Sequence, residues 1–184
     1  MSQSIQNQIE YFYASKEQTH CPQIPELIRI GKWFENYMKC KHIQLEVFVS
    51  RSFGKRVLIN TPPKNITNAS IEDFVEIIDF DPVRNTMLLI GQKQPSRTSA
   101  IHWYIHNTLS IDGYLLEMID QQQQGTWKKI YPNVKNAHSI VDTIKNILHQ
   151  IKKNQIIALD TKSVFILLKD IKELDKIIPQ LYEE

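Results

Sequence analysis

Two histidines in the sequence have a spacing that can bind a metal ion. His102 and His106 are four residues apart in a predicted helix, which places both imidazoles on one face. The zinc-peptidase pattern requires a glutamate directly after the first histidine, and Trp103 occupies that position. No other histidine, cysteine or acidic cluster nearby in the sequence offers a third ligand. The pattern therefore predicts two histidines on a partly buried helix face, and no metal site.

A second candidate site lies at the predicted start of the same helix, where Pro95 is followed by Ser96, Arg97 and Thr98. Hydroxyl groups, a guanidinium and free backbone N–H groups suit a phosphate or a carboxylate. The same residues also form an ordinary helix N-terminus with an exposed arginine, and local sequence alone favours this simpler interpretation. We keep Ser96, Arg97 and Thr98 as candidate ligand-binding residues.

Other catalytic patterns do not occur in the sequence. The five glycines form neither a Walker loop nor a G-x-G-x-x-G pattern, and there is no G-x-S-x-G elbow. The acidic residues Glu76, Asp79 and Asp81 are explained by polar strand faces and a proline turn. Nucleotide binding through a glycine-rich loop and esterase chemistry are therefore disfavoured.

Composition narrows the class of protein further. The 184 residues carry 22 Lys and Arg against 20 Asp and Glu, so the net charge is +2, and the basic residues form no cluster. Nucleic acid is therefore not the favoured partner. Cys21 and Cys40 are too few for a disulfide framework, residues 1–10 do not resemble a signal peptide, and no apolar run approaches the ~20 residues of a membrane span. We expect a cytoplasmic protein with no membrane segment and no cofactor.

The periodicity of apolar residues predicts an α/β domain at 23–184, preceded by an arm at 1–22 that shows no sustained period. Predicted helices cover 24–41, a segment from 95 through His106, 140–151 and 171–181. Predicted strands cover 43–49, 56–60, 74–80, 86–90, 155–159 and 163–168. Short turns join neighbouring strands into hairpins, which favours a largely antiparallel sheet flanked by helices.

The order of several short motifs resembles the class II aldolase/adducin family. The motifs are, in order, Val49-Ser50-Arg51, Arg56-Val57-Leu58-Ile59, the segment 66–76, Gly91 with Pro95-Ser96, His102, and the segment 164–173. The resemblance extends from residue 24 to residue 181. It implies a three-layer α/β/α fold with a mostly antiparallel central sheet, and homo-oligomers with the site between subunits.

The resemblance also implies where zinc chemistry would lie. Aldolases of this family bind zinc through an H-x-H pair and a third histidine, and a glutamate of a P-S-x-E motif transfers a proton. The resemblance places Thr98 at that glutamate, Leu116 and Met118 around Glu117 at the pair, and Lys162 at the third histidine. No H-x-H occurs anywhere in the chain. The resemblance therefore implies a fold that has lost its zinc chemistry, with Lys162 as a candidate cation in the former metal pocket.

These observations favour a divergent class II aldolase-like protein that acts as a binding or assembly module without zinc-dependent aldol chemistry. The alternative is a metal-free lyase or isomerase on a phosphorylated sugar or other small anionic carbonyl compound. That enzyme would use Lys162 as an iminium-forming or electrostatic group and Ser96 with Arg97 for the phosphate. A sensor could bind the same anion without turnover. For Lys162, a solvated turn residue between two strands is the simpler interpretation.

Overall fold

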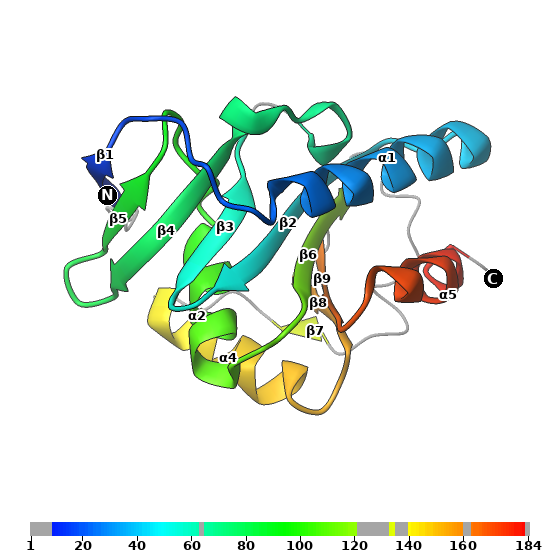
Figure 1. Ribbon diagram of the computed structural model, residues 1–184. Coiled ribbons are helices and arrows are strands. Elements are labelled where there is room, and N and C mark those ends of the chain that lie inside the picture. The colour runs from blue at the N-terminus through cyan, green and yellow to red at the C-terminus, as the bar shows by residue number, and fades with distance from the viewer. Residues whose placement is uncertain (1–8, 63–64, 121–132, 135–139, 160–162, 183–184) are drawn as a thin grey trace, which may run out of the picture.

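The computed structural model describes residues 9–62, 65–120, 133–134, 140–159 and 163–182, and these form one nine-stranded sheet with helices on it (Figure 1). The strands are β1 (Glu10–Ser15), β2 (Leu45–Phe53), β3 (Arg56–Asn60), β4 (Phe74–Asp81), β5 (Thr86–Ile90), β6 (Tyr114–Asp120), β7 (Asn133–Val134), β8 (Ile156–Leu159) and β9 (Ser163–Leu168). The α-helices are α1 (Ile24–Lys41), α2 (Ser99–Leu109), α4 (Ile140–Ile151) and α5 (Leu174–Gln180), and the 3-10 turns are η1 (Ile66–Asn68), η2 (Ile71–Asp73) and η3 (Ile171–Glu173).

The sheet is mostly antiparallel, as the hairpins predicted. Its strand order is β1-β5-β4-β3-β2-β6-β9-β8-β7, and β2 pairs with β3 on one side and with β6 on the other. Only β1 with β5 and β7 with β8 pair in parallel among the described strands. After β5, which lies near one edge of the sheet, the chain therefore returns to the middle, where β6 pairs with β2.

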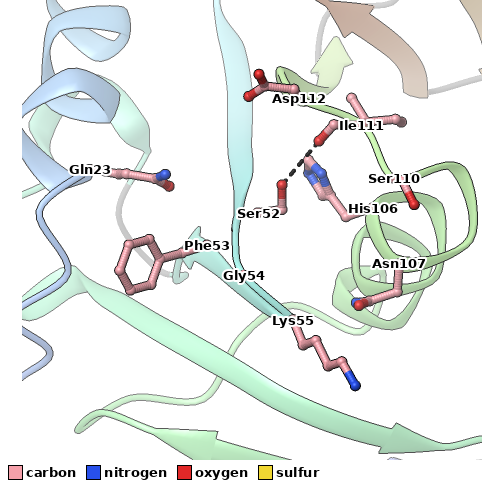
Figure 2. A pocket seen from close by; sticks show the side chains of 10 residues that line it. All are labelled: Gln23, Ser52, Phe53, Gly54, Lys55, His106, Asn107, Ser110, Ile111 and Asp112. Carbon is pink, nitrogen blue, oxygen red and sulfur yellow. Dashed lines mark hydrogen bonds between the residues drawn. The ribbon is translucent and has the colours of Figure 1, made fainter.

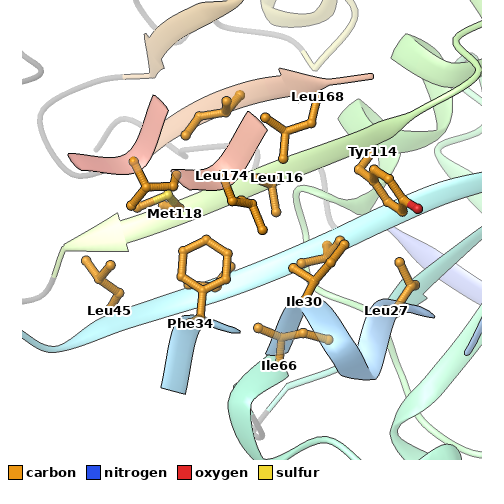
Figure 3. Packing of buried hydrophobic residues seen from close by; sticks show 14 of the residues in the cluster. Leu27, Ile30, Phe34, Leu45, Ile66, Tyr114, Leu116, Met118, Leu168 and Leu174 are labelled. Carbon is orange, nitrogen blue, oxygen red and sulfur yellow. The ribbon is translucent and has the colours of Figure 1, made fainter. Parts of the chain in front are cut away.

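Helices pack on both faces of the sheet, and the alternation of side chains in β6 separates the two sets of contacts. Leu116 and Met118 belong to a core cluster with Leu27 and Phe34 of α1 and Leu174 of α5 (Figure 3). Buried residues from the other side of the central strands pack against α2 and α4 instead. This cluster contains Ile101, Ile105, Leu115, Ile144, Ile147 and Phe165.

Periodicity located most of these elements, but not the first strand. The helix predicted at 24–41 is α1, and the strands predicted at 56–60 and 86–90 are β3 and β5. In contrast, Glu10–Ser15 lies within the predicted arm and forms strand β1 at the edge of the sheet. Its exposed positions include Phe12, and its half-buried positions include Ser15. Because polarity does not alternate along this strand, the sequence pattern did not reveal it.

Among the described helices, none combines the length and the apolar character that a bilayer-spanning helix needs.

We predict that Gly31→Ala destabilises the fold. Gly31 is buried in the middle of α1, and a Cβ atom there would overlap the backbone carbonyl of Ile66 in η1. Because a backbone group cannot move aside as a side chain can, we expect a loss of about 1 to 3 kcal/mol or more in the free energy of unfolding. Urea unfolding measures it. The exposed Asn36→Ala on the same helix is the control, and equal stability of the two variants would contradict this packing.

Candidate functional site

Ser50 of β2 lies at the centre of a group of buried polar side chains between the sheet and α2. Its hydroxyl oxygen is 2.7 Å from Nδ1 of His102 and 3.0 Å from Nε2 of His106. Ser50 and His102 are fully buried, and His106 is 2% exposed. The two histidines do share one helix face, as their spacing predicted, but they are buried rather than partly buried, and they meet a serine hydroxyl.

The group continues to the N-terminal end of α2 through Glu117 of β6. The Thr98 hydroxyl donates a hydrogen bond of 2.5 Å to Oε2 of Glu117, and the same oxygen is 3.6 Å from Nε2 of His102. The hydroxyls of Ser96 and Thr98 are 2.9 Å apart. Glu117 is only 1% exposed. Polar side chains therefore follow one another from Ser96 to His106 through the interior of the protein, although the 3.6 Å between His102 Nε2 and Glu117 is longer than a hydrogen bond.

Regular secondary structure brings these side chains together. Thr98, His102 and His106 follow one another at four-residue intervals, so they form a row along α2. Ser50 pairs with Leu115 in the β2–β6 ladder, two residues before Glu117, and side chains two apart on a strand point to one face. The row on the helix therefore faces two polar side chains on the sheet.

Burial decides the charge of His106. Removal from water lowers its pKa from the usual 6.5 to about 3, and the neighbouring His102 contributes to the lowering. A histidine with this pKa is neutral at physiological pH and carries one ring proton. If the ring proton of His106 is on Nε2, this nitrogen donates to the Ser50 hydroxyl oxygen. If the proton is on Nδ1, Nε2 accepts a hydrogen bond from the Ser50 hydroxyl.

The donors near Thr98 do not fit zinc. Glu117 and His102 are two potential ligands, whereas catalytic zinc sites use three from the protein. Across the described parts of the chain, no group of three or more His, Cys, Asp or Glu side chains could hold a metal ion. Lys162, which the resemblance places at a third ligand, lies outside the described residues.

The positions that the resemblance assigns to the H-x-H pair lie on the face of the sheet away from Thr98. Leu116 and Met118 face α1 and α5, on the opposite side of the sheet from Thr98. The β6 residue that contacts Thr98 is Glu117, between them. A shift of one residue along a strand exchanges the two faces, and the resemblance alone did not fix that register. Sequence reasoning did not assign Glu117 and Ser50 to the site, although both are buried polar residues of strands.

Ser96 and Arg97 line a cavity of about 290 Å³ in front of α2. Its other walls include Tyr11 of β1 and Pro62 after β3. The structure therefore brings Ser96 and Arg97 to one hollow, with Thr98 behind them in contact with Glu117. Burial raises the pKa of Tyr11, and the positive charge of Arg97 opposes that rise.

We predict that His106→Gln weakens the acid sensitivity of the fold. Unfolded His106 takes up a proton near pH 6.5, whereas the folded protein resists this until about pH 3. The stability contributed by the neutral imidazole is therefore complete above pH 6.5 and falls as the pH is lowered, by up to about 1.4 kcal/mol per pH unit. Urea unfolding across this range should give a shallower slope for the variant. Exposed Asn36→Ala, which removes no titrating group, should keep the original slope, and an unchanged slope in His106→Gln would contradict the assignment.

Solved structures share this fold at low sequence identity. An L-fuculose 1-phosphate aldolase aligns with 91% of this chain over 90% of its own, with a TM-score of 0.61 and 10% identity. The L-fuculose-1-phosphate aldolase from Thermus thermophilus covers 89% of this chain and 92% of its own, with a TM-score of 0.62 and 9% identity.

An aldolase II superfamily protein from Pseudomonas syringae covers 87% of this chain and 73% of its own, with a TM-score of 0.59 and 12% identity. No family model and no curated protein matches the sequence. At these identities the likeness concerns architecture and leaves activity to be argued from the site. The resemblance inferred from the sequence motifs is confirmed at the level of the fold: the chain has the fold of the class II aldolases.

Proposed function

We propose that the chain is a divergent class II aldolase-like protein that serves as a binding or assembly module without zinc-dependent aldol chemistry. The hydrogen bond from Thr98 to Glu117 carries this proposal. The resemblance assigns proton transfer to the position of Thr98, and a hydroxyl cannot act as a general base at neutral pH. Glu117 does not replace it, because its carboxylate is 1% exposed and already holds the Thr98 hydroxyl.

The proposal includes a three-layer arrangement, with α1 and α5 over one face of the sheet and α2 and α4 over the other. It also includes a homo-oligomer, by analogy with the resemblance to the class II aldolase/adducin family. A cytoplasmic location stays a prediction from the sequence.

Metal analysis together with an aldol-cleavage assay tests the loss of zinc chemistry. We expect purified protein to bind zinc at well below one ion per chain after dialysis, and to show no cleavage of L-fuculose 1-phosphate with or without added zinc. Stoichiometric zinc with cleavage by the unmodified protein would overturn the proposal.

The Ser96–Arg97 cavity favours a second candidate function, the binding of a small anionic or phosphorylated compound. Two of its walls carry a hydroxyl and a guanidinium, and guanidinium groups bind phosphate through paired hydrogen bonds. A neighbour of this fold is named for a phosphorylated sugar, L-fuculose 1-phosphate. A sensor would stop at binding. A metal-free lyase or isomerase at this cavity would be the catalytic form, with Lys162 as its candidate reactive amine.

We predict that inorganic phosphate or L-fuculose 1-phosphate raises the melting temperature of the protein, and that Arg97→Ala abolishes the rise. Ligand binding to the folded state stabilises it increasingly as the ligand concentration exceeds the dissociation constant, so the effect should grow with ligand concentration. Arg84→Ala is the control, because Arg84 is exposed and lies outside the cavity. Equal thermal shifts in both variants would show that the anion binds elsewhere.

A further inference from the structure

A groove of about 540 Å³ lies beside the first turns of α1, and it shares no lining residue with the Ser96–Arg97 cavity. Three segments form this α1 groove: residues 18–22, the N-terminal half of α1, and Ile71 of η2. Residues 18–22 belong to the stretch of chain that leads from β1 at the edge of the sheet to α1 (Figure 1). The volume lies within the range of small-molecule sites in proteins.

Much of the lining of the α1 groove is aliphatic. Ile24 is buried, Ile28 is half-buried, and Ile71 is 46% exposed, so apolar surface faces water across from the helix. Pro22 and Pro25 add further carbon atoms to the walls. No Phe, Tyr or Trp side chain is among the described residues that line the groove. The walls therefore suit an alkyl chain better than a stacked ring.

Two polar side chains of the linking stretch add little polarity to the groove. The Thr19 hydroxyl donates a hydrogen bond to the carboxylate of Glu76, so it is already engaged within the protein. Burial raises the pKa of the Cys21 thiol, which keeps this group neutral at physiological pH. A neutral buried thiol packs as a small apolar group. Both residues are therefore compatible with an apolar ligand.

The charge that lines the α1 groove is positive. Arg29 and Lys32 belong to the lining, and no Asp or Glu is among its described residues. Neither cation forms a salt bridge with a described side chain. Glu35, the acid on which Lys32 acts, instead binds Lys39 at 2.6 Å. An anionic group in the groove would therefore meet two cations that have no competing salt bridge in the described protein.

Another cavity, of about 570 Å³, lies beside the hairpin that joins β2 and β3, and its charges are balanced (Figure 2). Lys55 and Asp112 both line it, so it favours neither sign of charge on a ligand. The α1 groove combines aliphatic walls with positive charge alone. This combination specifies an amphipathic anion.

Helical spacing separates the apolar part of the groove from the charged part. Ile24 and Ile28 are one turn apart on α1, and Lys32 follows one turn later on the same face. At a rise of 1.5 Å per residue, Ile28 and Lys32 are about 6 Å apart along the helix axis. Arg29 lies beside Lys32, three residues earlier. A ligand that satisfies this row has an apolar tail toward the start of α1 and an anionic group one to two turns further along.

The start of α1 does not supply the anion contact. Its N–H groups at positions 26 and 27 both donate to the carbonyl of Gln23, and that of Ile24 donates to Cys21. Pro25 has no N–H. The backbone donors of the first turn are thereby occupied, which leaves the side chains of the second and third turns to hold an anion.

We propose that the α1 groove binds an aliphatic monocarboxylate of the medium-chain fatty-acid type. The alkyl chain packs against Ile24, Ile28 and Ile71, and the carboxylate accepts hydrogen bonds from Arg29 and Lys32. Removal of the tail from water supplies the affinity, and the charge-assisted hydrogen bonds fix its direction in the groove.

Calorimetric titration with octanoate, below the concentration at which it forms micelles, tests the site. We expect one molecule to bind per chain with a dissociation constant of about 1 mM or tighter. Hexanoate, which lacks two methylenes, should bind at least about fivefold more weakly. Octanamide, which lacks the charge, should bind about tenfold more weakly. Absence of saturable binding, or equal affinity for octanoate and octanamide, would overturn the proposal.

Phenylacetate tests the preference for an alkyl chain. It has a carboxylate and as many carbon atoms as octanoate, but its body is a ring. We expect weaker binding than that of octanoate, because the described walls offer no aromatic partner. Equal or tighter binding of phenylacetate would contradict the aliphatic assignment.

Exposed cations give a matched pair of double variants that should both fold. Arg29→Gln with Lys32→Gln should weaken octanoate about tenfold and leave octanamide unchanged. Lys41→Gln with Lys152→Gln removes the same charge outside the groove and should bind as the unmodified protein does. Equal effects of the two double variants would contradict the assigned roles of Arg29 and Lys32. Arg97→Ala should leave octanoate binding unchanged, which separates this groove from the anion cavity.

Methyl NMR of the unmodified protein locates the ligand without any substitution. Octanoate should shift the methyl resonances of Ile28 and Ile71 and saturate them at the same concentration as the calorimetric signal. The methyls of Ile147, which pack in the cluster on the other face of the sheet, should not respond. Unchanged resonances of Ile28 and Ile71 at saturating octanoate would refute the proposed site.

Discussion

A carboxylate that is buried between a sheet and a helix must be hydrogen-bonded, and the arrangement around Glu117 follows from that requirement. Thr98 donates to it at the start of α2, and His102 approaches it one turn later. His102 in turn needs a partner for its other nitrogen, which Ser50 supplies, and the Ser50 hydroxyl reaches His106. One buried acid thereby holds α2 in register with the central strands β2 and β6. Each polar side chain in this group therefore has a neighbouring polar side chain as its partner.

Local sequence patterns were sufficient to predict the elements that depend mainly on neighbouring residues. Helix α1 and strands β3 and β5 appear where periodicity placed them, because their apolar residues recur at helical or alternating spacing. Strand β1 was not predicted, because Phe12 is exposed and the partner strand β5 is far along the chain. The parallel pairing of β1 with β5 leaves no signal in a short stretch of sequence. Strand β6 was expected only from the resemblance.

The candidate site was also predictable only where local spacing determines it. The four-residue spacing of His102 and His106 gave their common face, and the hydroxyl-rich turn at Ser96 gave a cavity wall. Ser50 could not be assigned, because its partners are brought to it only by tertiary packing. Glu117 was passed over in favour of its two neighbours on the strand, and only the register of β6 against β2 shows which face meets α2.

The strand order has a consequence for how the chain assembles during synthesis. Strands β2 to β5 are antiparallel neighbours in chain order, so they can pair as soon as residue 90 has left the ribosome, and β1 can add to β5 at that time. β6 pairs with the free edge of β2 only later, after the chain has passed through α2 and has brought two strands together that are far apart in the sequence. Until then β2 presents an unpaired central edge, the kind of surface on which nascent chains aggregate. The polar row that needs both β2 and β6 can therefore form only when the two halves of the sheet meet.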